Sequence, residues 1–346
     1  MPEPFSGDRP TLEAVAARAG VSRATVSRVV NGSTGVRQSL VDKVVLAVEE
    51  LGYVPNHAAR TLVTRRTGAV AVILAEPEDR IFSDPFFSLQ IRGISKELTS
   101  HDTQLVLLLV EGSGDHDRIA RYLAGGHVDG ALAFSLHTDD PLPAIVRRAG
   151  LPTVYGGRPL WTVAPEQQAV PYVDADNRGG ARAAVRHLRD LGRTRIAHIA
   201  GPPDQTSATD RLDGYRDVLG DADPALTAQG AFTTESGARA MTELLERRPD
   251  VDAVFAANDL MASGALRVLR ERGRTVPGDV ALVGFDNLDS VAETTQPPLT
   301  TVQQDVEGQG RLMARLLLRR LGGEPEDGPD QGSVVMPTTL VRRASA

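Results

Sequence analysis

Residues 11–32 of the chain read TLEAVAARAGVSRATVSRVVNG. Apolar residues recur at helical spacing on both sides of Gly20, and this pattern predicts two short helices. Thr11 and Ser22 stand where an N-cap is expected, because their side-chain oxygens can accept bonds from free backbone N–H groups. Gly20 permits a tight turn between the helices. Two helices joined in this way form a helix-turn-helix, whose second helix can enter the DNA major groove.

The outer side of the second predicted helix carries residues that suit DNA recognition. Arg23 and Arg28 can each donate two hydrogen bonds to a guanine edge. Ser, Thr and Asn side chains nearby can contact phosphates and fix the register. A solvated helix in a small helical bundle would have the same composition, so that alternative stays open at this point.

A third, longer helix is predicted to begin at Ser39, with Asp42 at capping-box spacing, and to end at Gly52. Its expected apolar stripe consists of Leu40, Val41, Val44, Val45, Val48 and Leu51. Residues 1–10 are rich in proline and glycine and are expected to form a disordered N-terminus.

From Gly68 onward, short apolar segments alternate with amphipathic helices, which is typical of parallel sheets built from β-α-β units. The expected strands are 69–75, 104–109, 130–134, 153–155, 172–173, 196–200, 253–256 and 281–285. Residues 158–170 interrupt the alternation and are interpreted as the crossover between two α/β lobes. Residues 322–332 are predicted to form an acidic loop.

Composition narrows the class of protein. With 346 residues the chain exceeds what one hydrophobic core usually supports, so at least two domains are expected. The absence of cysteine excludes disulfides, thiolate metal sites and cysteine nucleophiles. No apolar run approaches about 20 residues and no leader-like segment opens the chain. We therefore expect a cytoplasmic protein that does not contact a membrane.

The charge is unevenly distributed. The net charge of −7 and a pI near 5.6 weigh against binding to nucleic acid. Residues 10–67, however, contain eight basic and four acidic side chains, so this segment carries +4 and the remainder −11. Because counterion release depends on local cationic contacts, the positive segment governs any interaction with phosphates.

The run from Thr11 to Gly68 closely resembles the DNA-binding headpiece and hinge of the lactose/galactose repressor (LacI/GalR) family, above all in VSRATVSRVVNG and GYVPNHAARTL. The resemblance implies base contacts by Arg23, Ala24 and Arg28, of which Ala24 can contact only a thymine methyl group. It also implies phosphate contacts by Thr11, Ser22, Thr25, Ser27 and Asn31.

Residues 55–67 are expected to form a hinge helix and linker. The segment that Asn56 can cap is too short to be a stable isolated helix. The resemblance implies that it folds when two copies pair in the minor groove, with Leu62 as a wedge between base steps and Ala59 allowing close approach. An ordinary linker with one surface leucine is the alternative.

Residues from about 68 to 341 resemble the periplasmic-binding-protein-like core of the same family. The matching segments follow in order: DPFF (84–87), VDADNRGGARAAVRHLRDLG (173–192), IAGPPD (199–204), DRLDGY (210–215), AANDLMASGALRVL (256–269), VGFDN (283–287), PPLTTVQQD (297–305) and MPTTLVRRAS (336–345).

The resemblance implies a fold with an all-α helix-turn-helix headpiece at 11–54, the hinge at 55–67, and a two-lobed α/β core with doubly wound parallel sheets at 68–346. Lobe 1 is expected at about 68–165 and 303–325. Lobe 2 is expected at about 166–302 and 333–342.

An effector site is expected between the lobes, because ligands of open α/β sheets bind beyond the carboxyl ends of the strands. The resemblance implies contacts from Phe86, Phe87, Arg158, Arg211, Asn258, Asp286 and Gln304. Arg211 and Asp286 are the expected gripping pair. For the two phenylalanines, plain core packing is the alternative. For Asp259 a helix cap is favoured over a ligand contact. For Asp176 both a ligand contact and a structural role stay open.

The function expected from the resemblance is transcriptional regulation, with repression favoured. The partners would be an operator DNA, a second copy of the chain, and a small effector. A sugar or sugar derivative is favoured as effector over a purine or nucleoside, or a protein corepressor. The chain lacks nucleotide-binding, hydrolase and metalloprotease motifs, so neither enzymatic activity nor a cofactor or metal is expected. A secreted sugar receptor of the same fold is disfavoured by the attached headpiece.

Overall fold

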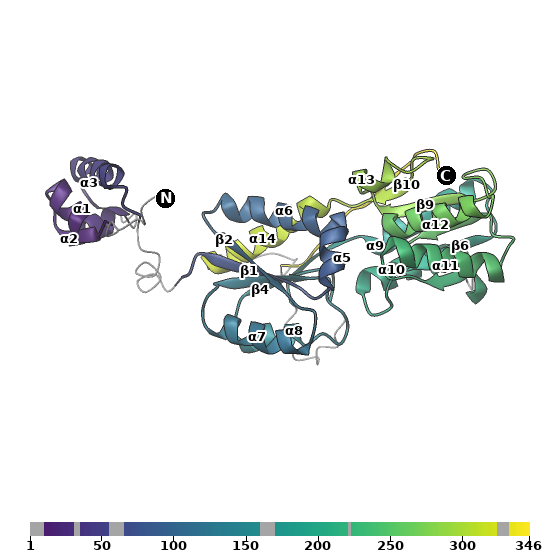
Figure 1. Cartoon of the computed structure of the whole chain (residues 1–346), viewed down its shortest axis with the longest axis horizontal. Helices are drawn as coiled ribbons and strands as arrows, with labels where there is room; N and C mark the ends of the chain where they lie inside the picture. Colours follow the sequence, from purple (N-terminus) through teal and green to yellow (C-terminus); the bar gives the residue numbers. More distant parts are fainter. Residues whose placement is uncertain (1–9, 31–34, 55–65, 160–169, 221–222, 324–331) are drawn as a thin grey trace, which may run out of the picture. The chain divides into compact units, whose positions relative to one another are not determined.

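The computed structural model describes residues 10–30, 35–54, 66–159, 170–220, 223–323 and 332–346. The chain divides into two compact units, Met1–Thr67 and Gly68–Ala346, which are described separately (Figure 1). The hinge segment with Asn56, Ala59 and Leu62 lies outside the described residues, as does Asn31. Among the described residues, no helix combines the length and hydropathy that crossing a bilayer requires.

The first unit contains the predicted helix-turn-helix. Its helices are α1 (Leu12–Ala19), α2 (Arg23–Val30) and α3 (Gln38–Leu51). The Thr11 side chain accepts a bond from Ala14 N at 3.2 Å, and Ser22 Oγ accepts one from Thr25 N at 3.1 Å, so both predicted caps are confirmed. Gly20 has φ 64°, the left-handed conformation that the turn requires. The helices enclose a small core of Val15, Ala16, Ala19, Val26, Val44, Ala47 and Tyr53.

The start of α3 differs from the prediction. Its N-cap is Arg37, which forms no side-chain cap, and Asp42 accepts instead from Gln38 Nε2 at 2.9 Å. Val45 is 45% exposed although the predicted stripe included it, whereas Ala47 is buried. The predicted apolar stripe of α3 is wider than the face of α3 that α1 and α2 cover. The predicted end at Gly52 is confirmed, with φ 60°.

In the second unit, lobe 1 is a parallel six-stranded sheet in the order β11-β5-β4-β3-β1-β2. Its strands are β1 (Ala69–Leu74), β2 (Gln104–Leu109), β3 (Gly130–Phe134), β4 (Thr153–Gly156), β5 (Tyr172–Ala175) and β11 (Val334–Met336). Its helices are α5 (Glu78–Ser83), α6 (Pro85–Thr99), α7 (Ser113–Ala124), α8 (Leu142–Arg148) and α14 (Val306–Gly322). Helices α6 and α14 cover one face of the sheet, and α7 and α8 cover the other (Figure 1).

Lobe 2 repeats this plan in the order β12-β10-β9-β8-β6-β7. Its strands are β6 (Ile196–Ala200), β7 (Thr227–Gln229), β8 (Ala253–Ala256), β9 (Ala281–Asp286), β10 (Thr300–Gln303) and the antiparallel edge strand β12 (Thr339–Val341). Its helices are α9 (Asn177–Asp190), α10 (Thr206–Leu219), the 3₁₀ turn η1 (Pro224–Leu226), α11 (Thr234–Arg247), α12 (Asp259–Glu271) and α13 (Asp289–Ala292). The predicted fold class of helical headpiece and two-lobed parallel α/β core is confirmed.

The predicted lobe boundaries are wrong at two places. Strand β5 pairs with β4, with Tyr155 opposite Tyr172, so the chain crosses to lobe 2 only after Ala175 and not within 158–170. Residues 333–342 do not belong to lobe 2 as a block, because β11 pairs with β5 and β12 with β10. Strand pairing is a contact between distant residues, and local composition does not record it.

All eight predicted strands are present, each with an end shifted by two residues at most. The strands β7, β10, β11 and β12 were not predicted. Each has only three or four residues, and β10 reads TTVQ, without a usable apolar pattern.

Helices α6 and α14 cross closely because each has a glycine at the contact. A Cβ atom at Gly93 would overlap the backbone oxygen of Glu307, and one at Gly310 would overlap the backbone oxygen of Gln90. This crossing fixes Gln90 on α6 and Gln309 on α14, both of which face the cavity described next.

Candidate functional site

A cavity lies between the two lobes of the second unit. Its empty space is about 920 Å³ when the open solvent at its mouth is included. Residues at or just beyond the carboxyl ends of strands in both sheets line it, among them Tyr155 and Asp174 from lobe 1 and Asn258 and Asp286 from lobe 2. This is the place at which open α/β sheets bind ligands.

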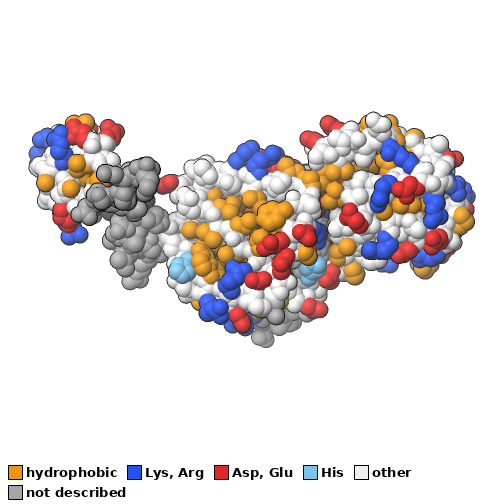
Figure 2. Space-filling view, in the orientation of Figure 1, with side chains coloured by type: hydrophobic (Ala, Val, Ile, Leu, Met, Phe, Trp, Pro, Cys, Tyr) orange, Lys and Arg blue, Asp and Glu red, His pale blue; other side chains and the backbone are white. Residues whose placement is uncertain are grey.

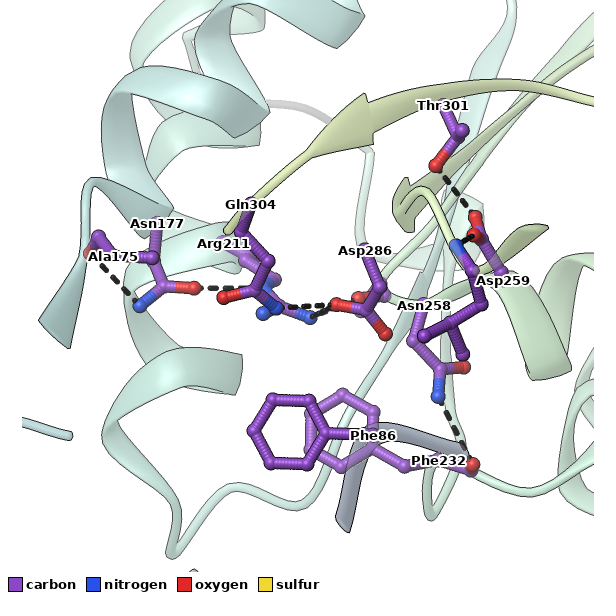
Figure 3. A network of polar contacts seen from close by, with 12 residues as sticks. Phe86, Ala175, Asn177, Arg211, Phe232, Asn258, Asp259, Asp286, Thr301 and Gln304 are labelled. Carbon is purple, nitrogen blue, oxygen red and sulfur yellow. Dashed lines mark hydrogen bonds and ion pairs between the residues drawn. The ribbon is translucent and has the colours of Figure 1, made fainter. Parts of the chain in front are cut away.

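Arg211 is the central cation of the lobe 2 wall (Figure 3). It projects from α10 and is 4% exposed. Its Nε donates to Asn177 Oδ1 at 2.9 Å, its Nη1 donates to the Ala257 carbonyl at 2.5 Å, and Nη1 lies 3.5 Å from Asp286 Oδ1. Its guanidinium carbon lies 3.7 Å from the centre of the Phe285 ring. These contacts hold the guanidinium in one orientation.

Asp286 ends β9 in a strained backbone conformation. Its φ is 108° and that of Asn287 is 55°, in the region that non-glycine residues rarely adopt and that clusters at functional sites. Gln304 Nε2 donates to Asp286 Oδ1 at 2.6 Å. Burial raises the pKa of Asp286 to about 7, against the opposing effect of Arg211. Near neutral pH this carboxyl group can therefore accept or donate a hydrogen bond.

The lobe 1 wall supplies aromatic faces. Phe86, Phe134 and Tyr155 line the cavity, and Asp84 caps α6 by accepting from Phe86 N at 2.9 Å. Burial raises the pKa of Asp84. An apolar ring beside fixed polar groups is the combination that binds the faces and edges of a small polar ring.

One direct bridge joins the lobes beside the cavity. His137 Nδ1 lies 2.7 Å from Asp204 Oδ2, and Thr138 N donates to the Asp204 carbonyl at 3.0 Å. Gln205 Nε2 donates to Glu76 Oε1 at 2.7 Å. The neighbouring Glu76, followed by Asp204, raises the pKa of His137 to about 9 despite partial burial. The bridge therefore joins an imidazolium to carboxylates of both lobes.

Arg158 forms a second bridge. Its guanidinium donates to both carboxylate oxygens of Asp210 on α10, at 2.6 and 2.8 Å. Its backbone N donates to Asp174 Oδ2 at 3.1 Å. Since Arg158 follows β4 in lobe 1, this ion pair also holds the lobes in their present arrangement.

The headpiece presents a candidate DNA-binding face. Arg23, Ala24 and Arg28 are exposed on α2, and Arg23 Nε lies 3.0 Å from Glu13 Oε1 on α1. On the face drawn in Figure 2, the headpiece exposes a group of basic side chains together with several acidic ones, and charges of both signs are interspersed over the core. The α2 helix thus exposes polar side chains on the side opposite buried Val26.

Residues 11–56 match the model of the lacI family of bacterial regulatory proteins, and residues 185–346 match a periplasmic binding protein-like domain. The HTH-type transcriptional regulator CelR of Thermobifida fusca is 53% identical over 341 residues, which cover 97% of this chain and 98% of that protein. The chain belongs to the lacI family.

Two solved structures of the family are similar over nearly the whole chain. A transcriptional regulator CelR–cellobiose complex has a TM-score of 0.77 and 49% identity, and the match covers 98% of this chain and 100% of that one. A lac repressor dimer bound to operator and the anti-inducer ONPF has a TM-score of 0.82 and 27% identity, covering 98% and 99%. This lacI-family chain is therefore a DNA-binding transcriptional regulator and not an enzyme, as the sequence predicted.

The structure brings six of the seven predicted effector residues together at the cavity: Phe86, Arg158, Arg211, Asn258, Asp286 and Gln304. Phe87 is the exception. It is 1% exposed, belongs to the lobe 1 core and stacks on Phe134 with ring centres 6.3 Å apart. The prediction is wrong for Phe87, because adjacent residues of a helix point about 100° apart and only one of the two can face the cavity.

The acidic residues with open roles prove to be structural. Asp176 caps α9 by accepting from Gly179 N at 2.8 Å. Asp259 is fully buried and accepts from Leu288 N at 2.8 Å and from Thr301 Oγ1 at 2.5 Å. The predicted cap role of Asp259 is wrong, because the cap of α12 is its neighbour Asn258, which accepts from Met261 N at 2.9 Å.

Several lining residues were not predicted. They are Arg80, Asp84, Gln90, Phe134, Ser135, His137, Thr138, Tyr155, Asp174, Asn177, Asp204, Gln205, Thr206, Ser207, Phe232 and Gln309, together with Leu136, Pro159, Gly156 and Gly157. Many lie just after β3 to β6. The rule that ligands bind beyond strand ends, applied to lobe 1 as well as lobe 2, would have found these.

Proposed function

We propose that this regulator is a repressor that binds a two-half-site operator as a homodimer, and that a sugar or sugar derivative bound between the lobes changes its DNA affinity. Cellobiose is the first effector to test. The observation that carries this proposal is the buried Arg211–Asp286 pair beside the Phe86 ring, since sugar hydroxyls need fixed donors and acceptors and the sugar ring needs an apolar face.

The relatives support the same reading. The CelR complex named with cellobiose is 49% identical and is covered in full by this chain. The lac repressor structure named as a dimer on its operator supports the proposed assembly. No observation in the cavity favours a purine, a nucleoside or a protein corepressor over a sugar, and these remain comparison ligands in the test.

Regulation would act through the bridges between the lobes. A ligand can shift DNA affinity only by binding two arrangements of the core unequally, and a coupling of roughly 1–3 kcal/mol is typical. A sugar that contacts Arg211 from one side and Phe86 from the other would favour the bridged arrangement. We propose that residues 55–67 transmit this change, with Asn56 capping the hinge helix, Ala59 allowing close approach and Leu62 as the minor-groove wedge.

On the DNA side, we propose that Arg23, Ala24 and Arg28 of α2 read bases. The phosphate contacts would come from Thr11, Ser22, Thr25, Ser27 and Asn31. The caps made by Thr11 and Ser22 orient the N-termini of α1 and α2, where backbone N–H groups favour phosphate.

The deciding experiment titrates the full chain with cellobiose by calorimetry and repeats the measurement with Asp286→Asn. The variant should bind cellobiose at least about 100-fold more weakly, because it removes the counter-ion that orients Arg211. Operator binding without sugar should persist. Asp217→Asn, a carboxylate of α10 paired with Arg178 away from the cavity, is the matched control.

Unchanged cellobiose binding by Asp286→Asn would refute the assigned pocket. If only nucleosides gave a heat of binding, the proposed effector class would be a nucleoside instead of a sugar. Operator binding measured with and without the sugar then gives the sign of the response.

A further inference from the structure

We infer that the cavity is selective for uncharged ligands, so that the phosphorylated form of a sugar it binds is rejected. This inference rests on the proposed function and concerns the chemical class of the effector. It follows from how the charged side chains around the cavity are already paired.

Every cationic side chain that lines the described part of the cavity is committed to a carboxylate. These pairs are Arg80 with Glu76 at 2.5 Å, Arg158 with Asp210 at 2.6 Å, Arg211 with Asp286 at 3.5 Å and His137 with Asp204 at 2.7 Å. In the sequence, residues 160–169, which lie outside the described part, contain no Lys or Arg. A ligand anion would have to break one of these pairs to gain a counter-ion.

Additional carboxylates face the cavity. Asp84 and Asp174 line it, and among the described residues neither forms an ion pair. Asp84 accepts from Phe86 N, and Asp174 accepts from Arg158 N, Ala175 N and the Asn177 side chain. Burial raises the pKa of both groups, which shows that this environment already disfavours negative charge.

Helix N-termini, the usual alternative for binding phosphate, are occupied as well. Asp84, Asp176 and Asn258 cap α6, α9 and α12 with their side chains. Helix α10 begins at the cavity without a side-chain cap. Asp204 and Asp210, however, stand on either side of its start, and each is paired with a cation, so an anion there would again have to compete with a carboxylate for His137 or Arg158.

Hydroxyl groups meet no such obstacle. They can donate to Asp286 or Asp174 and accept from the amide of Gln304, which donates one of its two N–H bonds to Asp286, without separating any ion pair. The wall therefore provides acceptors in excess and no free cation among its described residues, which suits a polyhydroxyl ligand and opposes a phosphate.

The test compares three ligands on the full chain by calorimetry: cellobiose, cellobiose 6′-phosphate and 6′-O-acetylcellobiose. The acetyl ester adds bulk at the same carbon without charge. We expect the acetyl ester to bind within about tenfold of cellobiose and the phosphate at least about 100-fold more weakly. The difference in affinity between the ester and the phosphate separates the effect of charge from the effect of size.

Phosphate binding within tenfold of cellobiose would overturn the inference and leave the proposed function intact. If the acetyl ester bound as weakly as the phosphate, the inference would also be overturned, because the space in the cavity and not the charge of the ligand would then set the selectivity. Absence of binding by all three would contradict the proposed function and this inference with it.

A variant tests the mechanism. Asp210→Asn removes the partner of Arg158 and leaves a cation free at the cavity wall, so the affinity ratio of phosphate to cellobiose should rise about tenfold. Asp217→Asn makes the same chemical change two turns further along α10, outside the cavity, and should leave the ratio unchanged. An unchanged ratio in Asp210→Asn, with cellobiose still bound, would show that ion pairing does not set the selectivity.

Discussion

Arg28 and Arg23 lie on the same exposed helix, but their side chains are not equivalent. Arg23 is paired with Glu13, whereas Arg28 sits in the last turn of α2 with its side chain exposed. An exposed ion pair contributes little to stability, so Glu13 can release Arg23 to DNA at small cost. Arg23 is held by an ion pair, whereas Arg28 forms none with the described residues.

Arg28→Ala should weaken operator binding by roughly 1–3 kcal/mol and relax the preference at one base position. The measurement is binding to a set of operators that differ at single positions. Arg18→Ala is a suitable control, because Arg18 lies on α1 and pairs with Glu50 of α3 at 2.5 Å. A uniform loss across all sequences would instead make Arg28 a phosphate contact.

His137 makes the bridged arrangement sensitive to pH. In this arrangement its pKa is about 9, above the ordinary value of 6.5, chiefly because of Glu76 and also Asp204. Arg80 pairs with Glu76, and Asp140 with His116 nearby completes the charged surroundings. A raised pKa stabilises the bridged form fully below about pH 6.5, and this contribution is lost as the pH rises through about 9.

If cellobiose favours the bridged form, its dissociation constant should increase several-fold between pH 7 and 9. His137→Asn should flatten this slope, while His116→Asn, a change in the same lobe outside the cavity, should retain it. The measured quantity is the pH dependence of the dissociation constant rather than its value at one pH, because His137 also lines the cavity. If the dissociation constant of His137→Asn depended on pH as in the parent chain, the titrating group would be a residue other than His137.

Among elements, the crossing of α6 and α14 tightly limits side-chain size at a contact that bears on the site. Gly93 and Gly310 let the two backbones touch, and the crossing places Gln90 and Gln309 at the cavity. The two helices come from opposite ends of the second unit's sequence, so their contact closes lobe 1.

Gly93→Ala should destabilise the core by about 1–3 kcal/mol, since its methyl group would collide with the backbone of α14. Gly114→Ala, on α7 with open space around it, should instead stabilise by up to about 1 kcal/mol through helix propensity. Urea denaturation of both variants measures this. The same sign for both would contradict the close crossing.

On the scale of the whole molecule, the two compact units have separate hydrophobic cores. The headpiece has a single small cluster, whereas the second unit has a cluster on each face of both sheets. Units with separate cores can unfold separately, and a ligand stabilises only the unit that binds it.

Calorimetric melting should therefore show two transitions, of which cellobiose raises only the one that belongs to the core. At 100 times its dissociation constant the sugar should add about 2.7 kcal/mol to the stability of that unit. Removing residues 1–67 should eliminate the other transition and leave this shift unchanged. A sugar-dependent shift of both transitions would show that the units unfold together.

Local sequence determined the elements. Helical periodicity, caps at Thr11 and Ser22, and glycine at positions 20 and 52 specify the headpiece, because each acts within a few residues. The eight predicted strands follow from the same kind of signal. The family resemblance added six residues that the structure places at the cavity, and it also added Phe87, which lies in the core.

Tertiary structure decided what depends on distant partners. It assigned β5 and β11 to lobe 1, turned Phe87 away from the cavity, and joined Arg158 to Asp210 across 52 positions. From the sequence, Arg158 is expected only to contact the effector, whereas in the fold its charge is neutralised by Asp210. Strand pairing and ion pairing depend on which distant residues meet, and that is settled only when the whole core is packed.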